Sequence, residues 1–263
     1  MERALELHRE AAAGAEGWML GRFVCPASRL EELSAALHPG ERVELSVVLD
    51  DGRLLRQPED ERLLVQAFEV RVPPEEDVTS FVERFARESH SGTGFFETAD
   101  RVDEVVGAVA ADNERHRRLL MHWSAMKLRC GGATAEAFPP PERVAHFLAA
   151  CAASGVWYKA TAGLHHPVRH VNSATGFTEH GFLNLLAASV FLANGLVTND
   201  RLVEVLEERD PEAFVLDRDL FGWRDLLVDQ GDVERGRHFF VGFGSCSFAE
   251  PVEDLRALGV LPL

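Results

Sequence analysis

Short runs rich in β-branched and aromatic residues alternate with amphipathic helical patterns along most of the chain. Side chains repeat every two residues in a strand and every three to four in a helix, and alternation of the two periods is typical of βα units on a parallel sheet. This pattern restricts the chain to α/β architectures. Eight runs are expected to form strands: 18–25, 43–49, 65–72, 93–98, 125–130, 156–161, 213–217 and 238–243.

The run 141–155 carries the strongest helical pattern. Val144, Phe147 and Leu148 recur at the spacing of one helical face, the run opens with a proline, and it ends with a glycine. Weaker helical patterns cover 29–37, 75–88, 101–121, 180–195 and 200–209.

Eight strands with intervening helices in a chain of 263 residues predict a single (βα)8 TIM-type barrel domain over residues 1–263. The barrel is expected to be irregular between the sixth and seventh strands, where the connection is unusually long. A doubly wound open parallel sheet is the alternative. The first strand is followed by PASRLEEL and not by G-x-G-x-x-G, so the phosphate-binding fingerprint of a dinucleotide fold is missing.

Composition and charge limit the possible binding partners and the cellular compartment of the protein. The net charge of −16, with no basic stripe, argues against a nucleic-acid partner. The longest apolar helical run, 182–193, is shorter than the roughly 20 residues that cross a bilayer, and the first residues lack the apolar core of a signal peptide. Four widely spaced cysteines without a C-x-x-C pair are expected to be reduced thiols. The sequence predicts a cytoplasmic protein without a membrane partner and leaves a homo-oligomer open.

Residues two apart in a strand share a face, and three expected strands place polar side chains on one face and apolar ones on the other. The apolar face of a barrel strand packs on helices, so the polar face is expected to line the barrel mouth. With Glu97 added, the charged members sum to +2 and predict an anionic ligand. An ion-pair network that shapes the end of the barrel is the alternative. The residues are Glu69 and Arg71, Lys127 and Arg129, and Lys159 and Thr161.

Lysine is rare in this chain, since of 27 Lys and Arg residues only Lys127 and Lys159 are lysines. Arginine stays protonated, whereas a desolvated lysine can lose its proton and act as a nucleophile or base. Two amines about 6 Å apart would repel by roughly 3 kcal/mol, which lowers the pKa of one of them. Neighbouring Glu69 and Glu97 would oppose this shift. Imine formation and simple charge clamping are the two functions that the lysines indicate.

The segment YKATAG, residues 158–163, resembles the lysine-bearing strand end of class I, Schiff-base-forming aldolases, in particular the K-x-S-T-G pattern of deoxyribose-phosphate aldolase. The resemblance covers about ten residues. It implies that Lys159 is the Schiff-base lysine and that Thr161 stands at the following hydroxyl position. The family takes its second lysine from the next strand, whereas Lys127 lies one strand earlier here.

Four histidines follow the Lys159 strand, and His165 and His166 come first. Next to an amine they are expected to act as general acids or phosphate donors. A divalent metal at His165, His166 and His170 is a minor alternative, because Pro167 interrupts any helix there and no HExxH spacing occurs. A third interpretation makes them polar loop residues.

Two glycine-rich loops at expected strand ends are candidate phosphate cradles, because backbone N–H groups at such loops bind anions. A glycine turn with a serine cap is the alternative for the last loop. Cys130, Cys246 and Cys25 also lie at expected strand ends, so a thiolate nucleophile beside an imidazole is a further hypothesis. The loop residues are Gly131 and Gly132 after the fifth strand and Gly244, Ser245 and Ser247 after the eighth.

Together these patterns predict a lyase of the aldolase type that acts on a small carbonyl metabolite bearing phosphate or carboxylate, with no cofactor. One alternative is a metal-dependent or acid–base lyase or isomerase that uses the loop from His165 to His180. Another is a non-catalytic barrel that binds an anionic metabolite or a protein partner. The expected roles are imine formation for Lys159, charge control for Lys127, proton transfer for Glu69 or Glu97, and anion binding for Arg71 and Arg129.

Overall fold

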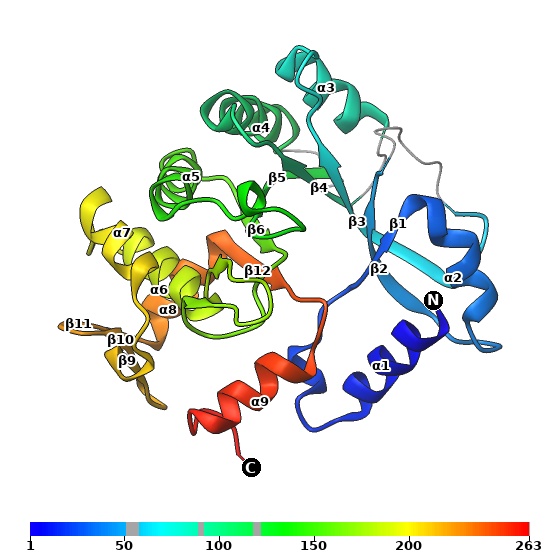
Figure 1. Cartoon of the computed structure of the whole chain (residues 1–263). Coiled ribbons are helices and arrows are strands. Elements are labelled where there is room, and N and C mark those ends of the chain that lie inside the picture. Colours follow the sequence, from blue (N-terminus) through cyan, green and yellow to red (C-terminus); the bar gives the residue numbers. More distant parts are fainter. Residues whose placement is uncertain (51–57, 89–91, 118–121, 263) are drawn as a thin grey trace. The chain divides into compact units, whose positions relative to one another are not determined.

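The computed structural model of the chain describes residues 1–50, 58–88, 92–117 and 122–262 (Figure 1). Seven strands form the main sheet in the order β1-β2-β3-β4-β5-β6-β12. Six of them follow the chain order, as expected for sequential strands that lie next to each other. Their bounds are β1 (Phe23–Pro26), β2 (Val43–Val48), β3 (Leu63–Arg71), β4 (Gly92–Glu97), β5 (His122–Arg129), β6 (Tyr158–Thr161) and β12 (Phe240–Gly244).

The sheet is open, because β1 and β12 stand at its two ends and do not pair with each other in the described chain. A closed (βα)8 barrel, the first prediction, is therefore not found, and the open parallel sheet of the alternative prediction is. The expected seventh strand explains the difference. Residues 213–217 form β9 (Phe214–Leu216), which pairs antiparallel with β10 (Leu220–Trp223), and β10 pairs with β11 (Leu226–Asp229) in a separate sheet. Among the described residues, the backbone of β9 forms its hydrogen bonds with the neighbouring hairpin strand and not with the main sheet.

The chain divides into two compact units, Met1–Met126 and Lys127–Leu263. The division falls inside β5, so the two halves of this strand belong to different units. The single domain expected over residues 1–263 stays a prediction.

The first unit carries helices α1 (Glu2–Ala13), α2 (Leu30–Ala36), α3 (Val78–Glu88) and α4 (Val102–His116). In α3, Val78, Phe81 and Phe85 are buried at the i, i+3, i+7 spacing of one helical face. Figure 1 shows α3 and α4 side by side. The helices expected at 29–37, 75–88 and 101–121 are confirmed as α2, α3 and α4, although residues 118–121 lie outside the described chain. The short helices η1 (Gly17–Met19) and η2 (Ala27–Arg29) flank β1, which begins later than expected.

The second unit carries five α-helices among its described residues, and the expected ones at 141–155, 180–195 and 200–209 are confirmed as α5, α6 and α7. Most of α6 is buried, and α8 packs on it so closely that a side chain on Gly236 would overlap Val190. A small hairpin and two short helices complete the unit. The bounds are α5 (Pro141–Ala153), α6 (Phe182–Ala193), α7 (Asn199–Glu207), α8 (Gln230–Phe239), α9 (Ala249–Ala257), β7 (His170–Val171), β8 (Thr178–Glu179), η3 (Ala135–Ala137) and η4 (Pro211–Ala213).

Strand β6 follows the alternation that its sequence predicts. Tyr158 and Ala160 are buried, whereas Lys159 and Thr161 are partly exposed. The Tyr158 ring stacks on Phe240 of β12 at 5.7 Å between centroids and meets Phe147 of α5 edge-on at 5.8 Å. Aromatic packing on one face therefore fixes Lys159 and Thr161 on the other.

None of the helices in the described part of the chain combines the length and the apolar character that a membrane crossing requires.

Candidate functional site

The predicted polar residues of the strands divide between the two units. Glu69, Arg71 and Glu97 belong to the first. Glu69 is buried and accepts a hydrogen bond from the Ser46 hydroxyl at 2.8 Å. Arg71 is exposed and stands opposite Glu97 in the parallel ladder of β3 and β4, so the two share a face. Their predicted roles in proton transfer and anion binding stay predictions.

Both lysines belong to the second unit. Lys127 in β5 is 7% exposed, and Lys159 in β6 is partly exposed. The N–H of Cys130 donates to the carbonyl oxygen of Thr161 at 2.8 Å. In a regular parallel ladder this bond aligns Cys130 with Ala162 and, three residues earlier, Lys127 with Lys159. Neighbouring strands lie about 4.8 Å apart, so the two lysines start from adjacent positions on one face.

The turns that follow β5 and β6 touch each other through glycine. A side chain on Gly131 would lie 3.0 Å from the Cα of Gly163, and Gly163 has a φ of +68°. Ala162 also adopts a left-handed backbone, with a φ of +66°, which costs a non-glycine residue about 1 kcal/mol or more. Arg129 folds back over this turn, and its Nε donates to the carbonyl oxygen of Gly131 at 2.9 Å. The backbone is therefore strained directly after the strand that carries Lys159.

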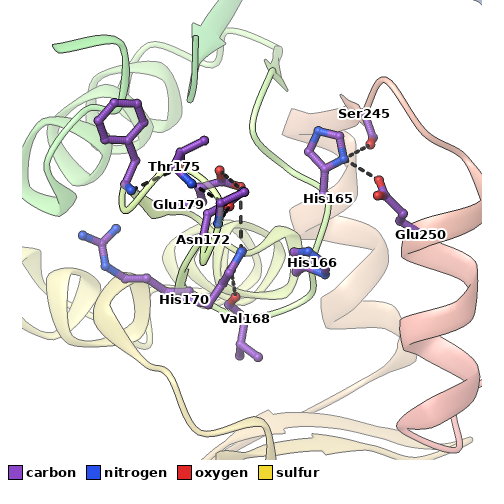
Figure 2. Close-up of polar contacts among 12 residues, drawn as sticks. His165, His166, Val168, His170, Asn172, Thr175, Glu179, Ser245 and Glu250 are labelled. Atoms are coloured by element: carbon purple, nitrogen blue, oxygen red, sulfur yellow. Dashed lines mark hydrogen bonds and ion pairs between the residues drawn. The ribbon is translucent and has the colours of Figure 1, made fainter. Parts of the chain in front are cut away.

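His165 and His166 lie in a loop that buried Leu164 and Pro167 anchor on both sides. Each histidine contacts a carboxylate of α9: His165 Nδ1 lies 2.7 Å from Glu250 Oε2, and His166 Nδ1 lies 2.7 Å from Asp254 Oδ2. Residues four apart in a helix share a face, so a single stripe of α9 holds both rings. Figure 2 shows Ser245 and Glu250 both contacting the same nitrogen of the His165 ring, Nδ1.

The carboxylate of Glu250 decides how His165 is protonated. An ionised carboxylate can only accept hydrogen bonds, so Nδ1 of His165 carries the hydrogen and Nε2 of the neutral ring is an acceptor. This hydrogen bond lowers the pKa of Glu250, which keeps the carboxylate ionised near neutral pH. Sequence reasoning missed Glu250 as a site residue, and its only local signal is the spacing of Glu250 and Asp254 in EPVED.

His170 lies near a backbone carbonyl and a carboxylate. His170 Nδ1 lies 3.1 Å from the carbonyl oxygen of Val168, and its Nε2 lies 3.8 Å from Glu179, which accepts from Asn172 at 2.8 Å (Figure 2). The rings of His166 and His170 are perpendicular, with centroids 4.6 Å apart. In the described chain no group of three or more His, Cys, Asp or Glu side chains is arranged to hold a metal ion.

The predicted phosphate loops are built as turns. Ser247 Oγ accepts from the N–H of Glu250 at 3.2 Å, and the N–H of Ser247 donates to Ser245 Oγ at 3.2 Å. The carbonyl oxygen of Gly244 accepts from Ala162 at 3.3 Å. After β5, a side chain on Gly132 would press against Ala137. Anion binding by these loops stays a prediction.

Protein stability is expected to fall when the pH drops from about 6.5 to 4, because burial lowers the pKa of His180 from 6.5 to about 4. His180 Nε2 donates to the carbonyl oxygen of Pro139 at 2.7 Å, and Nδ1 accepts from Arg169 at 3.2 Å. The unfolded chain binds the extra proton between these pH values, so stability is full above 6.5 and decreases on acidification by up to about 3 kcal/mol.

Urea unfolding at about pH 7.5 and about pH 5 measures this loss. The H180Q variant keeps a donor and an acceptor but cannot titrate, and it should lose less stability on acidification. Burial also lowers the pKa of His8, so the H8Q variant measures how much His8 contributes to the loss of stability on acidification. An unchanged loss in H180Q would contradict the prediction.

Comparison of the chain with protein-family models, curated proteins and solved structures found no match. The function is therefore inferred from the site itself.

Proposed function

We propose that the protein is a lyase of the aldolase type, in which Lys159 forms an imine with a small aldehyde or ketone that carries a phosphate or carboxylate. The observation that carries this proposal is the alignment of the chain's two lysines on adjacent strands. Like charges this close disfavour protonation of both amines, and burial of Lys127 adds to that cost. We expect one amine of the pair to reach the neutral form that attacks a carbonyl.

The chemistry needs a proton donor as well as an amine. Lys159 adds to the carbonyl carbon, and loss of the resulting hydroxyl group as water requires a proton at that oxygen. His165 is the candidate donor, because Glu250 holds its Nδ1 and stabilises the ring when it is charged. The iminium ion then accepts the electron pair of the bond that breaks next to it. Lys127 and Arg129 are the candidate cations for the anionic group of the substrate.

Borohydride trapping tests the imine, and the scarcity of lysine makes the result easy to assign. The protein is incubated with pyruvate, dihydroxyacetone phosphate or glyceraldehyde 3-phosphate, reduced with borohydride and mapped by peptide mass spectrometry. We expect an adduct on Lys159 with at least one of these compounds and none at this position in K159R. Modification found only at the amino terminus would contradict the proposal.

The R143K variant is a matched control for non-specific amine chemistry. Arg143 is exposed on α5, so the substitution adds a solvated amine without touching the strand ends. We expect no adduct on this added lysine under conditions that modify Lys159. Equal modification of both would mean that the strand-end amine has no special reactivity.

A histidine-centred acid–base lyase or isomerase is the second candidate, and the two histidine–carboxylate pairs favour it. This reaction would run without an imine, so it would survive in K159R and be lost in H165Q. A protein that only binds an anionic metabolite would instead be stabilised thermally by that ligand, both in the wild type and in K159R, with no turnover.

A further inference from the structure

Cys246 differs from the other three cysteines in its exposure. It lies in the loop between β12 and α9 and is exposed, whereas Cys25, Cys130 and Cys151 are buried. Burial raises the pKa of Cys25 to about 11 and raises the pKa of Cys130 and Cys151 further, so these three remain protonated thiols. A reagent in solution therefore reaches Cys246 first.

The thiol of Cys246 faces the free nitrogen of His165. Its Sγ lies 3.4 Å from Nε2, within hydrogen-bonding distance for sulfur, while Nδ1 of the same ring lies 2.7 Å from Glu250. Because Nδ1 carries the hydrogen, Nε2 is the acceptor and the S–H group is the donor. A nucleophile, a base and a carboxylate that orients the base are thus connected in a row, which is the arrangement that activates a catalytic thiol.

Local structure holds the three groups from independent directions. Glu250 is fixed in the first turn of α9, where Ser247 accepts its N–H at 3.2 Å. Pro251, Val252 and Leu255 bury the opposite side of that helix. Leu164 is fully buried and anchors the loop that carries His165. The alignment of thiol, imidazole and carboxylate therefore does not depend on a single flexible contact.

We propose that Cys246 is a covalent nucleophile that takes an acyl group from small esters or thioesters, with His165 as its base and Glu250 as the residue that positions His165. Because the thiol is exposed, its surroundings place little steric limit on the acyl group or on the leaving group. Small activated acyl compounds are therefore the expected class. This activity is separate from imine formation and does not require Lys159.

Both half-reactions balance without an oxidant or a metal. As sulfur attacks the acyl carbon, the S–H proton passes to His165 Nε2; the bond to the leaving oxygen or sulfur then breaks, and the leaving group takes that proton. A thioester remains on Cys246. Water next adds to the thioester carbonyl and gives a proton to His165, which returns it to the departing Cys246 sulfur, so that a carboxylic acid is released.

The experiment uses p-nitrophenyl acetate with the full chain, following release of p-nitrophenolate and locating the acetyl group by peptide mass spectrometry. We expect acetylation of Cys246 in the wild type and its loss in C246S. H165Q should lower the acetylation rate about 100-fold, the usual size of general-base assistance. H38Q, which changes a largely exposed histidine of the first unit, should leave the rate unchanged.

The role of Glu250 is tested by a measurement that a purely structural role would leave unchanged. A carboxylate stabilises the imidazolium that forms as the thiol gives up its proton, so E250Q should slow acetylation about tenfold near neutral pH and move the acid limb of its pH profile to lower pH. E253Q, which removes an exposed carboxylate from the same helix, should leave the profile in place. Circular dichroism checks that each variant is folded.

Acetylation of Cys246 at the same rate in H165Q as in the wild type would overturn the proposal, as would p-nitrophenolate release that tracks acetylation of lysine with Cys246 unmodified. Failure here is distinguishable from failure of the proposed lyase, because borohydride trapping on Lys159 is expected to persist in C246S. Conversely, acetylation of Cys246 does not depend on any imine.

Discussion

The G181A variant is expected to lose about 2–4 kcal/mol of unfolding free energy. Gly181 precedes α6, and a methyl group there would overlap the carbonyl oxygen of Pro167 and the Cα of Val168. The backbone of Gly181 is extended, with φ −90° and ψ 145°, so the dihedral angles alone would accept alanine. The cost arises because fixed backbone atoms occupy the space, together with the Oδ1 atom of Asn184, which is itself held by a hydrogen bond from Arg169.

The G181A substitution should also loosen the histidine loop. Phe182 N–H donates to His166 and Leu183 N–H donates to Pro167, at 3.1 and 2.8 Å. Pushing this loop away weakens both bonds, so amide exchange at Phe182 and Leu183 should accelerate. Calorimetry measures the loss of stability, and hydrogen exchange locates it.

The G107A variant is the matched control and is expected to change stability in the opposite direction. Gly107 lies inside α4, where an added methyl group meets nothing within 4 Å. Alanine is favoured over glycine in a helix by about 1 kcal/mol. If both variants were equally stable, steric overlap at Gly181 would be ruled out as the cause.

The N184L variant is expected to lose about 3–5 kcal/mol of unfolding free energy. Asn184 is fully buried in α6 and makes three hydrogen bonds: Nδ2 donates to the carbonyls of Val205 and Glu208 at 2.8 and 2.9 Å, and Oδ1 accepts from the N–H of Arg169 at 2.9 Å. Leucine has similar volume but leaves these backbone groups without a side-chain partner in a buried site, at about 1–1.5 kcal/mol each.

Urea unfolding of N184L gives the loss directly, and N199L is its control. Asn199 begins α7 and is exposed, so the same chemical change there should alter stability by less than about 0.5 kcal/mol. A loss in N184L no larger than in N199L would show that the buried amide contributes nothing. Because Asn184 ties Arg169 to the end of α7, the variant should also speed exchange of the Arg169 amide.

Much of the fold could be predicted because its signals are local. The apolar periodicity of α3 and α5 and the β-branched runs of β2 and β3 appear in any window of ten residues. Closure of the sheet could not be predicted in the same way. The run at 213–217 has strand composition, but its hydrogen bonds go to β10. The residues of the run do not specify whether it pairs with a hairpin strand or with the main sheet.

The candidate site was predictable only in part. Alternation along a strand places Lys159 opposite Tyr158, and burial of Tyr158 confirms that parity. The pairing of His165 with Glu250 and Cys246 joins residues 85 and 81 positions apart. Nothing in either segment marks its partner.

The sequence by itself determined the α/β class, most helices and strands, and the face of β6 on which Lys159 lies, because each depends on the period of neighbouring side chains. Only the tertiary structure decided that the sheet is open, that Cys130 at the end of β5 bonds to Thr161 of β6, and that one stripe of α9 holds two consecutive histidines. The physical reason is that strand pairing and loop anchoring are set by packing between distant segments, and local periodicity carries no information about which segments meet.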